Sequence, residues 1–328
     1  MNMPKTSSND YDDSVGEVSD NQSFEVLEQL AEHWELRAGV KKKELNPEIT
    51  FDAHAPDFLP ELLPFHNHDL FLSADSQAKS KALSCGWVAY NEKTIDIESY
   101  IVSPSCLDIL YGRLPQTQNS IIKWTASETL TDEAYHVLLV TNTCRITRQR
   151  RGLETLKLPT FDLVRFMQRE MAMVDEEWKK RLINLATATV SEVFVSDYLS
   201  LIADAEHIQP INRLTTDVHR KDEMAHSSIF KHLMKVIYPY LTQKEQDYLA
   251  EILPKPVSWF ASQELDVWES MLSQIRFPNY QEMIADCRSE HIVNLGRIDY
   301  SGLTTLADEL GILRSQRGQD SFGEAGLQ

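Results

Sequence analysis

Two short stretches of the chain repeat one pattern of acidic and imidazole side chains. Residues 132–136 (DEAYH) and 222–226 (DEMAH) both read D-E-x-x-H, and each lies in a strongly helical stretch. Residues three apart on a helix share a face, with Cβ atoms about 5–6 Å apart. Glu133 with His136, and Glu223 with His226, can therefore each hold one metal ion.

A two-metal centre in a helical bundle needs further carboxylates from other helices. Ferritin-like di-metal bundles use a Glu-x-x-His from each of two helices and a single Glu from each of the other two. Upstream of the first motif, Glu98 lies on an inward stripe with Trp87 and Ile101. Between the motifs, Glu192 lies on a stripe with Leu199 and other apolar or small residues. Burying such carboxylates is costly unless cations compensate their charge.

A third imidazole joins the second motif, because His219 lies four residues before Glu223 on the same helix face. The predicted metal ligands are Glu98, Glu133, His136, Glu192, His219, Glu223 and His226. This mixture of carboxylates and imidazoles suits iron or manganese. One E-x-x-H is usually a surface coincidence, but two D-E-x-x-H motifs, each preceded by an inward Glu, are hard to obtain by chance.

The aspartate of each motif has a different predicted role. Asp132 and Asp222 each precede their glutamate and point roughly 100° away from it on a helix, so neither is expected to bind metal directly. We expect each to accept the imidazole N–H of a histidine on the opposite helix and so fix its tautomer.

Helices must position these residues, and the sequence predicts a mostly helical chain. Apolar residues recur at spacings of three and four, and prolines separate the periodic segments. The predicted helices lie near 24–36, 75–102, 116–143, 160–206, 211–237, 242–252, 258–276 and 279–296, with a break around 175–178. The expected fold is all-α, a ferritin-like four-helix bundle with additional flanking helices.

The domain organisation follows from composition and length. Residues 1–23 are rich in Ser, Asn and Asp, so we expect a disordered acidic tail there. Residues 315–328 lack periodicity and are expected to be flexible. No repeat or low-complexity linker divides the part between, which predicts a single helical domain over residues 24–314.

The charge and cysteine content exclude several classes of protein. A formal charge of -18 disfavours nucleic-acid binding, and the basic cluster Arg145, Arg148, Arg150 and Arg151 is interpreted as a solvated loop pairing with an acidic surface. No apolar run approaches bilayer length, so no membrane is expected and the protein should be cytoplasmic. The four cysteines, Cys85, Cys106, Cys144 and Cys287, form no C-x-x-C pair and are interpreted as buried free thiols.

Between about residues 75 and 300 the chain resembles the AurF-like di-iron N-oxygenases, which include p-aminobenzoate N-oxygenase and the arylamine oxygenase of chloramphenicol biosynthesis. The resemblance rests on the seven residues above, in the family's order and with similar separations. His219 matches the third histidine that distinguishes this family from two-histidine bundle oxygenases. The resemblance implies a di-iron centre that uses dioxygen to oxidise a small-molecule amine to a hydroxylamine in natural-product biosynthesis, with nitroso or nitro as alternative end points.

The resemblance also implies where the substrate binds. It suggests that Tyr90 and a cation on the same helix, here Lys93, receive the carboxylate of an arylamine, and Arg297 is a further candidate anchor. Lys93 stands where we expect Arg in the aminobenzoate enzyme, and its flexible point charge replaces a bidentate fork. This difference disfavours aminobenzoate itself. For both cations the alternative is an ordinary surface salt bridge.

Other functions stay open at this point. The same ligands would serve a di-iron oxygenase that hydroxylates C–H bonds, a ferritin-like iron-handling protein, or a structural bundle in which Glu and His merely pair. The substrate amine is either aryl or aliphatic. No G-x-G-x-x-G fingerprint for a flavin or nicotinamide occurs, so we expect an external electron donor such as a separate reductase. A homodimer is the expected assembly.

Overall fold

The computed structural model of the chain describes residues 13–42, 51–289 and 299–327. These three ranges contain helices and loops but no β-strand. The predicted all-α fold is thus confirmed.

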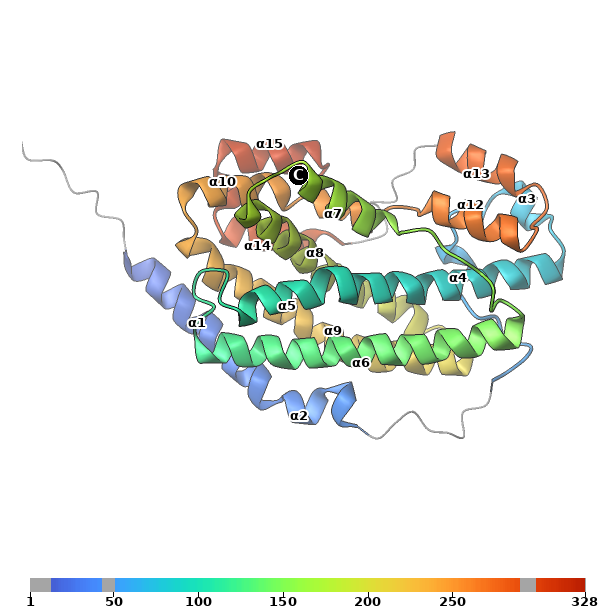
Figure 1. Cartoon of the computed structure of the whole chain (residues 1–328), viewed down its shortest axis with the longest axis horizontal. Helices are drawn as coiled ribbons and strands as arrows, with labels where there is room; N and C mark the ends of the chain where they lie inside the picture. The colour runs from blue at the N-terminus through green and yellow to red at the C-terminus, as the bar shows by residue number, and fades with distance from the viewer. Residues whose placement is uncertain (1–12, 43–50, 290–298, 328) are drawn as a thin grey trace, which may run out of the picture.

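Four long helices form the centre of the molecule. They are α4 (Ser76–Ile97), α6 (Ser120–Arg151), α8 (Glu177–Ala203) and α9 (Pro210–Ile237). The most extensive packing is between α8 and α9 and between α4 and α6, and α6 also contacts α9 (Figure 1). This is the expected four-helix bundle, and the motif helices α6 and α9 are neighbours in it.

A π-helical turn interrupts the first bundle helix at Glu98, one of the predicted metal ligands. A π-helical turn, η3 (Glu98–Val102), follows α4 directly and continues into α5 (Ser103–Leu110). The sequence predicts an end near residue 102 because of Pro104, but this proline lies in the first turn of α5, where a missing N–H does little harm. Single π turns within α-helices occur frequently at functional sites.

Helix α6 is longer than predicted and contains the basic cluster. It continues past residue 143 to Arg151 and ends at Gly152, whose φ of 66° is a left-handed conformation that glycine adopts easily. The interpretation of the cluster as a loop is therefore wrong. Its pairing with acidic groups is confirmed for two members. Arg148 lies 2.7 Å from Glu92, and Arg151 lies 2.7 Å from Asp57.

The flanking helices cover the bundle on several sides (Figure 1). At the N-terminus, α1 (Asp13–Glu32), α2 (Trp34–Arg37) and the 3-10 turn η1 (Gly39–Lys41) lie along α6 and α9. Helix α7 (Asp162–Ala172) packs with α11 (Lys255–Phe260), and α10 (Gln243–Ile252) packs on α8. The remaining elements are η2 (Pro60–Leu62), α3 (Asp69–Leu72), η4 (Tyr238–Tyr240), α12 (Leu265–Gln274), α13 (Tyr280–Ser289), α14 (Ser301–Glu309), η6 (Ile312–Arg314) and α15 (Gln316–Glu324).

Both expected tails differ from the structure. Helix α1 begins at Asp13, inside the stretch 1–23 that composition marks as disordered, and residues 1–12 of that stretch lie outside the described residues. An existing helix extends easily into polar residues, because only its nucleation is costly. At the other end, α15 occupies most of residues 315–328 and packs against α10. Its Phe322 is fully buried and Leu327 is also buried, so tertiary packing fixes a segment whose composition looks loose.

The other predicted elements differ in detail. The expected break near 175–178 separates α7 from α8, and the single helix predicted over 258–276 is divided into α11 and α12. The predicted helix 279–296 is described only as far as residue 289. The expectation that no apolar run approaches bilayer length is wrong for α8, which is long and apolar enough to cross a membrane. However, 72% of its apolar window is buried, as in the core helix of a bundle. Cys85, Cys106 and Cys144 are buried free thiols, as predicted, and Cys287 is also buried.

Candidate metal centre

All seven predicted metal ligands meet in the middle of the bundle. Each is at most 2% exposed, so solvent has almost no contact with them. They come from four elements: Glu98 from η3, Glu133 and His136 from α6, Glu192 from α8, and His219, Glu223 and His226 from α9. The structure thus brings together side chains that are far apart in sequence. The first and the last, Glu98 and His226, are separated by 128 positions.

Their ligand atoms form overlapping groups rather than one point. Three groups each hold atoms that lie within 4.8 Å of one another. The groups are Glu98, His136, His219 and Glu223; Glu133, His136, Glu223 and His226; and Glu98, Glu133 and Glu192. Several residues belong to two groups, which is the pattern that side chains shared between two neighbouring ions would give.

The two motif histidines are held in matching orientations. His136 Nδ1 lies 3.0 Å from Glu133 Oε2 and 3.2 Å from Glu223 Oε1. His226 Nδ1 lies 3.0 Å from Glu133 Oε1 and 3.8 Å from Glu192 Oε2. Both Nδ1 atoms therefore face the carboxylates, where a bound metal ion would be.

The opposite ring nitrogens face the two motif aspartates. His136 Nε2 lies 3.2 Å from Asp222 Oδ2, and His226 Nε2 lies 3.2 Å from Asp132 Oδ2. Each aspartate thus contacts the histidine of the other motif. An imidazole that donates through Nε2 keeps the Nδ1 lone pair for a metal ion.

The third histidine joins the same cluster from one helical turn away. His219 Nε2 lies 2.9 Å from Glu223 Oε1 and 3.7 Å from Glu98 Oε1. Its ring centroid is 4.1 Å from that of His136. Burial lowers the pKa of His219, and the neighbouring His136 lowers it further. The ring is therefore neutral at physiological pH, which is the form that binds metal.

The electrostatics of the cluster fit bound cations. Glu98 Oε2, Glu192 Oε2 and Glu223 Oε2 have no hydrogen-bond partner among the described residues. A buried polar atom without a partner costs roughly 1–3 kcal/mol. Burial raises the pKa of Glu98 and Glu192 well above its usual value, and the charges of Glu133 and Glu223 raise it further. Metal ions would compensate these charges and the unpartnered atoms together.

Sequence reasoning missed a segment that supports both aspartates. We call residues 34–41 the strap; it consists of α2, Ala38 and η1. Trp34 Nε1 donates to Asp132, at 3.0 Å from Oδ1 and 2.9 Å from Oδ2. The backbone N–H of Gly39 donates to both oxygens of Asp222 at 3.1 Å. In the sequence, the only signs of these contacts are Trp34 and Gly39 themselves, and the spacing of neither residue indicates a site.

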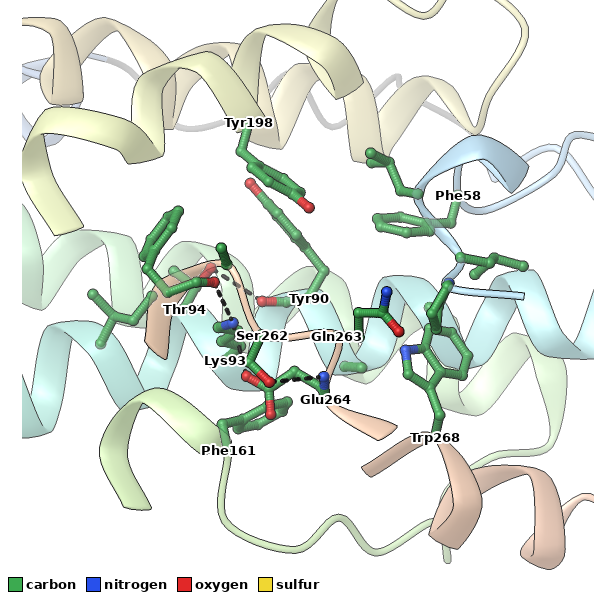
Figure 2. A pocket seen from close by; sticks show the side chains of 18 of the residues that line it. Phe58, Tyr90, Lys93, Thr94, Phe161, Tyr198, Ser262, Gln263, Glu264 and Trp268 are labelled. Carbon is green, nitrogen blue, oxygen red and sulfur yellow. Dashed lines mark hydrogen bonds and ion pairs between the residues drawn. The ribbon is translucent and has the colours of Figure 1, made fainter. Parts of the chain in front are cut away.

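A cavity of about 140 Å³ (Figure 2) is lined in part by the bundle helices that lead to Glu98 and contain Glu192. Thr94 and Ile97 of α4 line it just before Glu98, and Val195 of α8 lines it three residues after Glu192. Aromatic side chains form much of the remaining wall, namely Phe58, Tyr90, Phe161, Tyr198, Phe260 and Trp268.

The structure places two of the three predicted substrate residues at this cavity. Tyr90 and Lys93 both line it, whereas Arg297 lies outside the described residues. The Tyr90 hydroxyl is buried and has no hydrogen-bond partner in the described part of the chain. Burial and the nearby charge of Glu223 raise the pKa of Tyr90, so the hydroxyl stays a donor. Lys93 Nζ lies 2.8 Å from Glu264 Oε1, so this cation already has a partner.

Comparison with known proteins identifies the same family that the seven predicted metal ligands indicate. The family model described as "P-aminobenzoate N-oxygenase AurF" matches residues 20–311. The chain belongs to this family. It is 28% identical over 290 residues to the 4-aminobenzoate N-oxygenase of Streptomyces thioluteus, an alignment that covers 88% of this chain and 86% of the relative.

Membership of the AurF family agrees with the fold and activity that the sequence predicts. The match extends over the bundle and the flanking helices as far as residue 311, so it includes all seven clustered side chains and the strap. The chain is accordingly an enzyme of the N-oxygenase class, with a helical bundle and buried acidic and imidazole groups that could hold metal.

Removing metal from this AurF-family protein is expected to destabilise it. A ligand at 100 times its dissociation constant stabilises the folded state by about 2.7 kcal/mol, which corresponds to roughly 5–10 °C in Tm at about 2–4 °C per kcal/mol. We expect a fall of this size after treatment with a chelator, because the buried carboxylates then repel one another. Differential scanning calorimetry measures it, and ferrous iron should restore the original Tm. An unchanged Tm would indicate a bundle in which Glu and His merely pair.

Proposed function

We propose that the protein is a di-iron N-oxygenase that oxidises the amine of a small arylamine with dioxygen. The observation that carries this proposal is the convergence of four glutamates and three histidines in a bundle whose helices also line an aromatic cavity. The cavity volume of about 140 Å³ is close to that of an engineered cavity of roughly 150 Å³ that binds benzene. An aromatic ring therefore suits it better than a flexible aliphatic amine.

The reaction needs electrons from outside the chain. Oxidation of the amine follows R–NH2 + O2 + 2 e⁻ + 2 H⁺ → R–NHOH + H2O, in which one oxygen atom enters the N–O bond and the other leaves as water. Two iron ions bound by the seven side chains would supply the redox chemistry for dioxygen reduction. The external electron donor is a separate reductase or a small reductant. Nitroso and nitro products correspond to further rounds on the same nitrogen.

The protein's own residues prepare the reaction. Asp132 and Asp222 orient the histidine rings, so that their Nδ1 atoms face the carboxylates. Burial of the cluster excludes bulk water, which strengthens the electrostatic interactions there and limits side reactions. The aromatic wall holds the ring of the substrate with its amine toward Thr94 and Val195, which lie about one helical turn from Glu98 and Glu192 in the sequence. The hydroxyl of Tyr90 donates a hydrogen bond to the bound substrate.

Two measurements test the proposal. Elemental analysis of the purified protein should give about two irons per chain rather than manganese or a large number of irons. The chemically reduced protein should then convert arylamines to hydroxylamines on exposure to air, as seen by mass spectrometry. Exclusive ring hydroxylation would indicate the alternative C–H oxygenase, and iron uptake without any organic product would indicate an iron-handling protein.

The setting of the enzyme is part of the same proposal. It acts in the cytoplasm, as a homodimer, in a natural-product pathway that uses an N-oxidised small molecule. Size-exclusion chromatography with light scattering tests the homodimer, and pull-down with the reduced protein tests the separate reductase.

A further inference from the structure

The polar part of the cavity wall is an ion pair rather than a single cation. Lys93 and Glu264 are the only basic and the only acidic residues among the described residues that line the cavity. Lys93 Nζ lies 2.8 Å from Glu264 Oε1 and 3.3 Å from the backbone oxygen of Phe260. Figure 2 shows both side chains on the same part of the wall. The charge of Lys93 is therefore compensated before any substrate enters.

The position of Glu264 is held at an energetic cost. Its φ of 54° is left-handed, a conformation that costs a residue with a Cβ roughly 1–3 kcal/mol. Its Oε2 accepts a hydrogen bond of 2.8 Å from the backbone N–H of Asp162, which fixes the carboxylate against the start of α7. Glu264 is 8% exposed. A buried, strained acid at a cavity wall indicates a role for its charge.

This pair is a poor partner for a carboxylate and a good one for a neutral polar group. A ligand carboxylate near Lys93 would also lie beside the Glu264 carboxylate, where burial weakens screening and strengthens repulsion. An ammonium group has three N–H donors, and two are used by Glu264 and Phe260. One donor on Lys93 and the acceptor oxygen of Glu264 remain for a ligand. Together they match a group that both accepts and donates, such as a carboxamide.

We propose that Glu264 makes the enzyme selective for arylamines whose second ring substituent is an uncharged polar group, such as a carboxamide, over those that carry a carboxylate. This rests on the proposed N-oxygenation. It also separates the chain from its relative, whose name refers to 4-aminobenzoate.

The test compares 4-aminobenzamide with 4-aminobenzoate as substrates. We expect the wild-type kcat/KM for the amide to exceed that for the acid by at least about tenfold. The reason is that repulsion between the buried carboxylate of the acid and that of Glu264 costs more free energy than a tenfold difference in kcat/KM represents. Glu264→Gln keeps the shape and removes the charge, so the ratio should shift toward the acid by about tenfold or more. Glu92→Gln is the matched control, because Glu92 also pairs with a cation but lies outside this cavity.

Further outcomes distinguish this selectivity from the proposed function itself. Equal use of both substrates by the wild type, or an unchanged ratio in Glu264→Gln, would overturn the selectivity. If Glu264→Gln does not fold, Glu264→Asn gives the second test, because it also removes the charge and Asn tolerates a left-handed backbone, and the preference for the amide should fall with it as well. If neither compound is oxidised, the proposed N-oxygenation is refuted for these substrates. The selectivity can then still be tested from the affinities of the two compounds, measured by equilibrium dialysis.

A different observation supports a second inference, which concerns the strap. Besides the hydrogen bonds from Trp34 and Gly39, the strap places a cation between the two aspartates. Arg37 NH1 lies 3.7 Å from Asp132 Oδ2 and 4.0 Å from Asp222 Oδ1. Its nitrogens have no hydrogen-bond partner in the described part of the chain, so it acts on both carboxylates through charge.

The strap approaches Asp222 as closely as the chain allows. A Cβ on Gly39 would lie 2.9 Å from Asp222 Oδ2, and 3.1 Å from side-chain atoms of both Tyr135 and Val218. Any other residue here would force the side chain of Asp222 or its neighbours to shift. One short segment thereby fixes both aspartates, and each aspartate contacts a histidine of the other motif.

We infer that the strap positions the two histidines through Asp132 and Asp222 and slows the loss of metal from the centre. Trp34, Arg37 and Gly39 are then positioning residues that do not touch the metal. Loss of a group that supports a metal ligand typically costs roughly 10–100-fold in metal affinity or activity.

The test measures the release of iron to a chelator from fully loaded protein. Trp34→Phe removes the N–H donor and keeps most of the volume, and we expect iron to leave roughly ten times faster or more. Leu36→Ala is the matched control, because Leu36 is on the strap but 76% exposed. Calorimetry checks that each variant is folded. A folded Trp34→Phe protein that releases iron at the wild-type rate would overturn the inference, and Arg37→Met serves as the second variant if Trp34→Phe does not fold.

Discussion

The Glu223→Ala protein is expected to purify folded, with less than one iron per chain, and to lose N-oxygenation by more than about 100-fold. Glu223 contributes to two of the three ligand groups and lies 2.9 Å from His219 and 3.2 Å from His136. Removing a group that only supports a ligand already costs roughly 10–100-fold, so loss of a shared carboxylate should cost more. Iron content by elemental analysis and single-turnover product yield measure the two effects.

The control for this variant lies next to it on α9. Met224→Ala changes the adjacent side chain, which points about 100° away on the helix and is 66% exposed, and it should keep wild-type iron content and activity. The prediction fails if Glu223→Ala retains two irons and most of its activity, because Glu223 would then be a buried acid without a metal.

The His219→Ala protein is expected to keep at least part of its iron but to lose amine oxidation by about tenfold or more. His219 belongs to one ligand group only, so other residues still hold both sides of the centre. The group removed is a neutral imidazole close to Glu98 and Glu223, and it is expected to control the reaction with oxygen more than metal retention. A change of tenfold in rate corresponds to about 1.4 kcal/mol in the barrier.

Stopped-flow absorption after mixing the reduced protein with oxygen distinguishes the two roles of His219. We expect a faster decay of the oxygen-dependent absorption in His219→Ala, with the iron content determined on the same sample. Lys221→Ala, two residues away and largely exposed, should behave as the wild type. Wild-type absorption and product yield in His219→Ala would show that this histidine does not bind metal.

Much of the cluster of acidic and imidazole side chains could be predicted because the spacing of residues along a helix determines which face each side chain lies on. The E-x-x-H pairs and His219 lie at intervals of three and four, and Glu98 and Glu192 lie on stripes that are otherwise apolar. A buried face then limits where each side chain can go. The contacts of Asp132 and Asp222 with the opposite histidines followed from the same periodicity.

Other features could not be predicted because they depend on contacts between distant segments. Trp34 and Asp132 are 98 residues apart, and nothing in the local sequence around Trp34 refers to the motif helix. Lys93 was identified as a cation near the substrate, but its partner Glu264 lies in a turn between α11 and α12 that periodicity assigned to one continuous helix. Phe322 anchors α15 through tertiary packing, which composition does not report.

The π turn at Glu98 constrains how this protein can vary. A turn of this kind contains one residue more than an α-helical turn, so every position after it is rotated by about 100° relative to an uninterrupted α-helix. Deleting Ser99 or Tyr100 would remove the extra residue of the π turn. It would also move the buried Ile101 from three to two positions after Glu98, about 200° around an α-helix, so that these two side chains could no longer share the inward face. Insertions and deletions here should therefore be tolerated far less than substitutions.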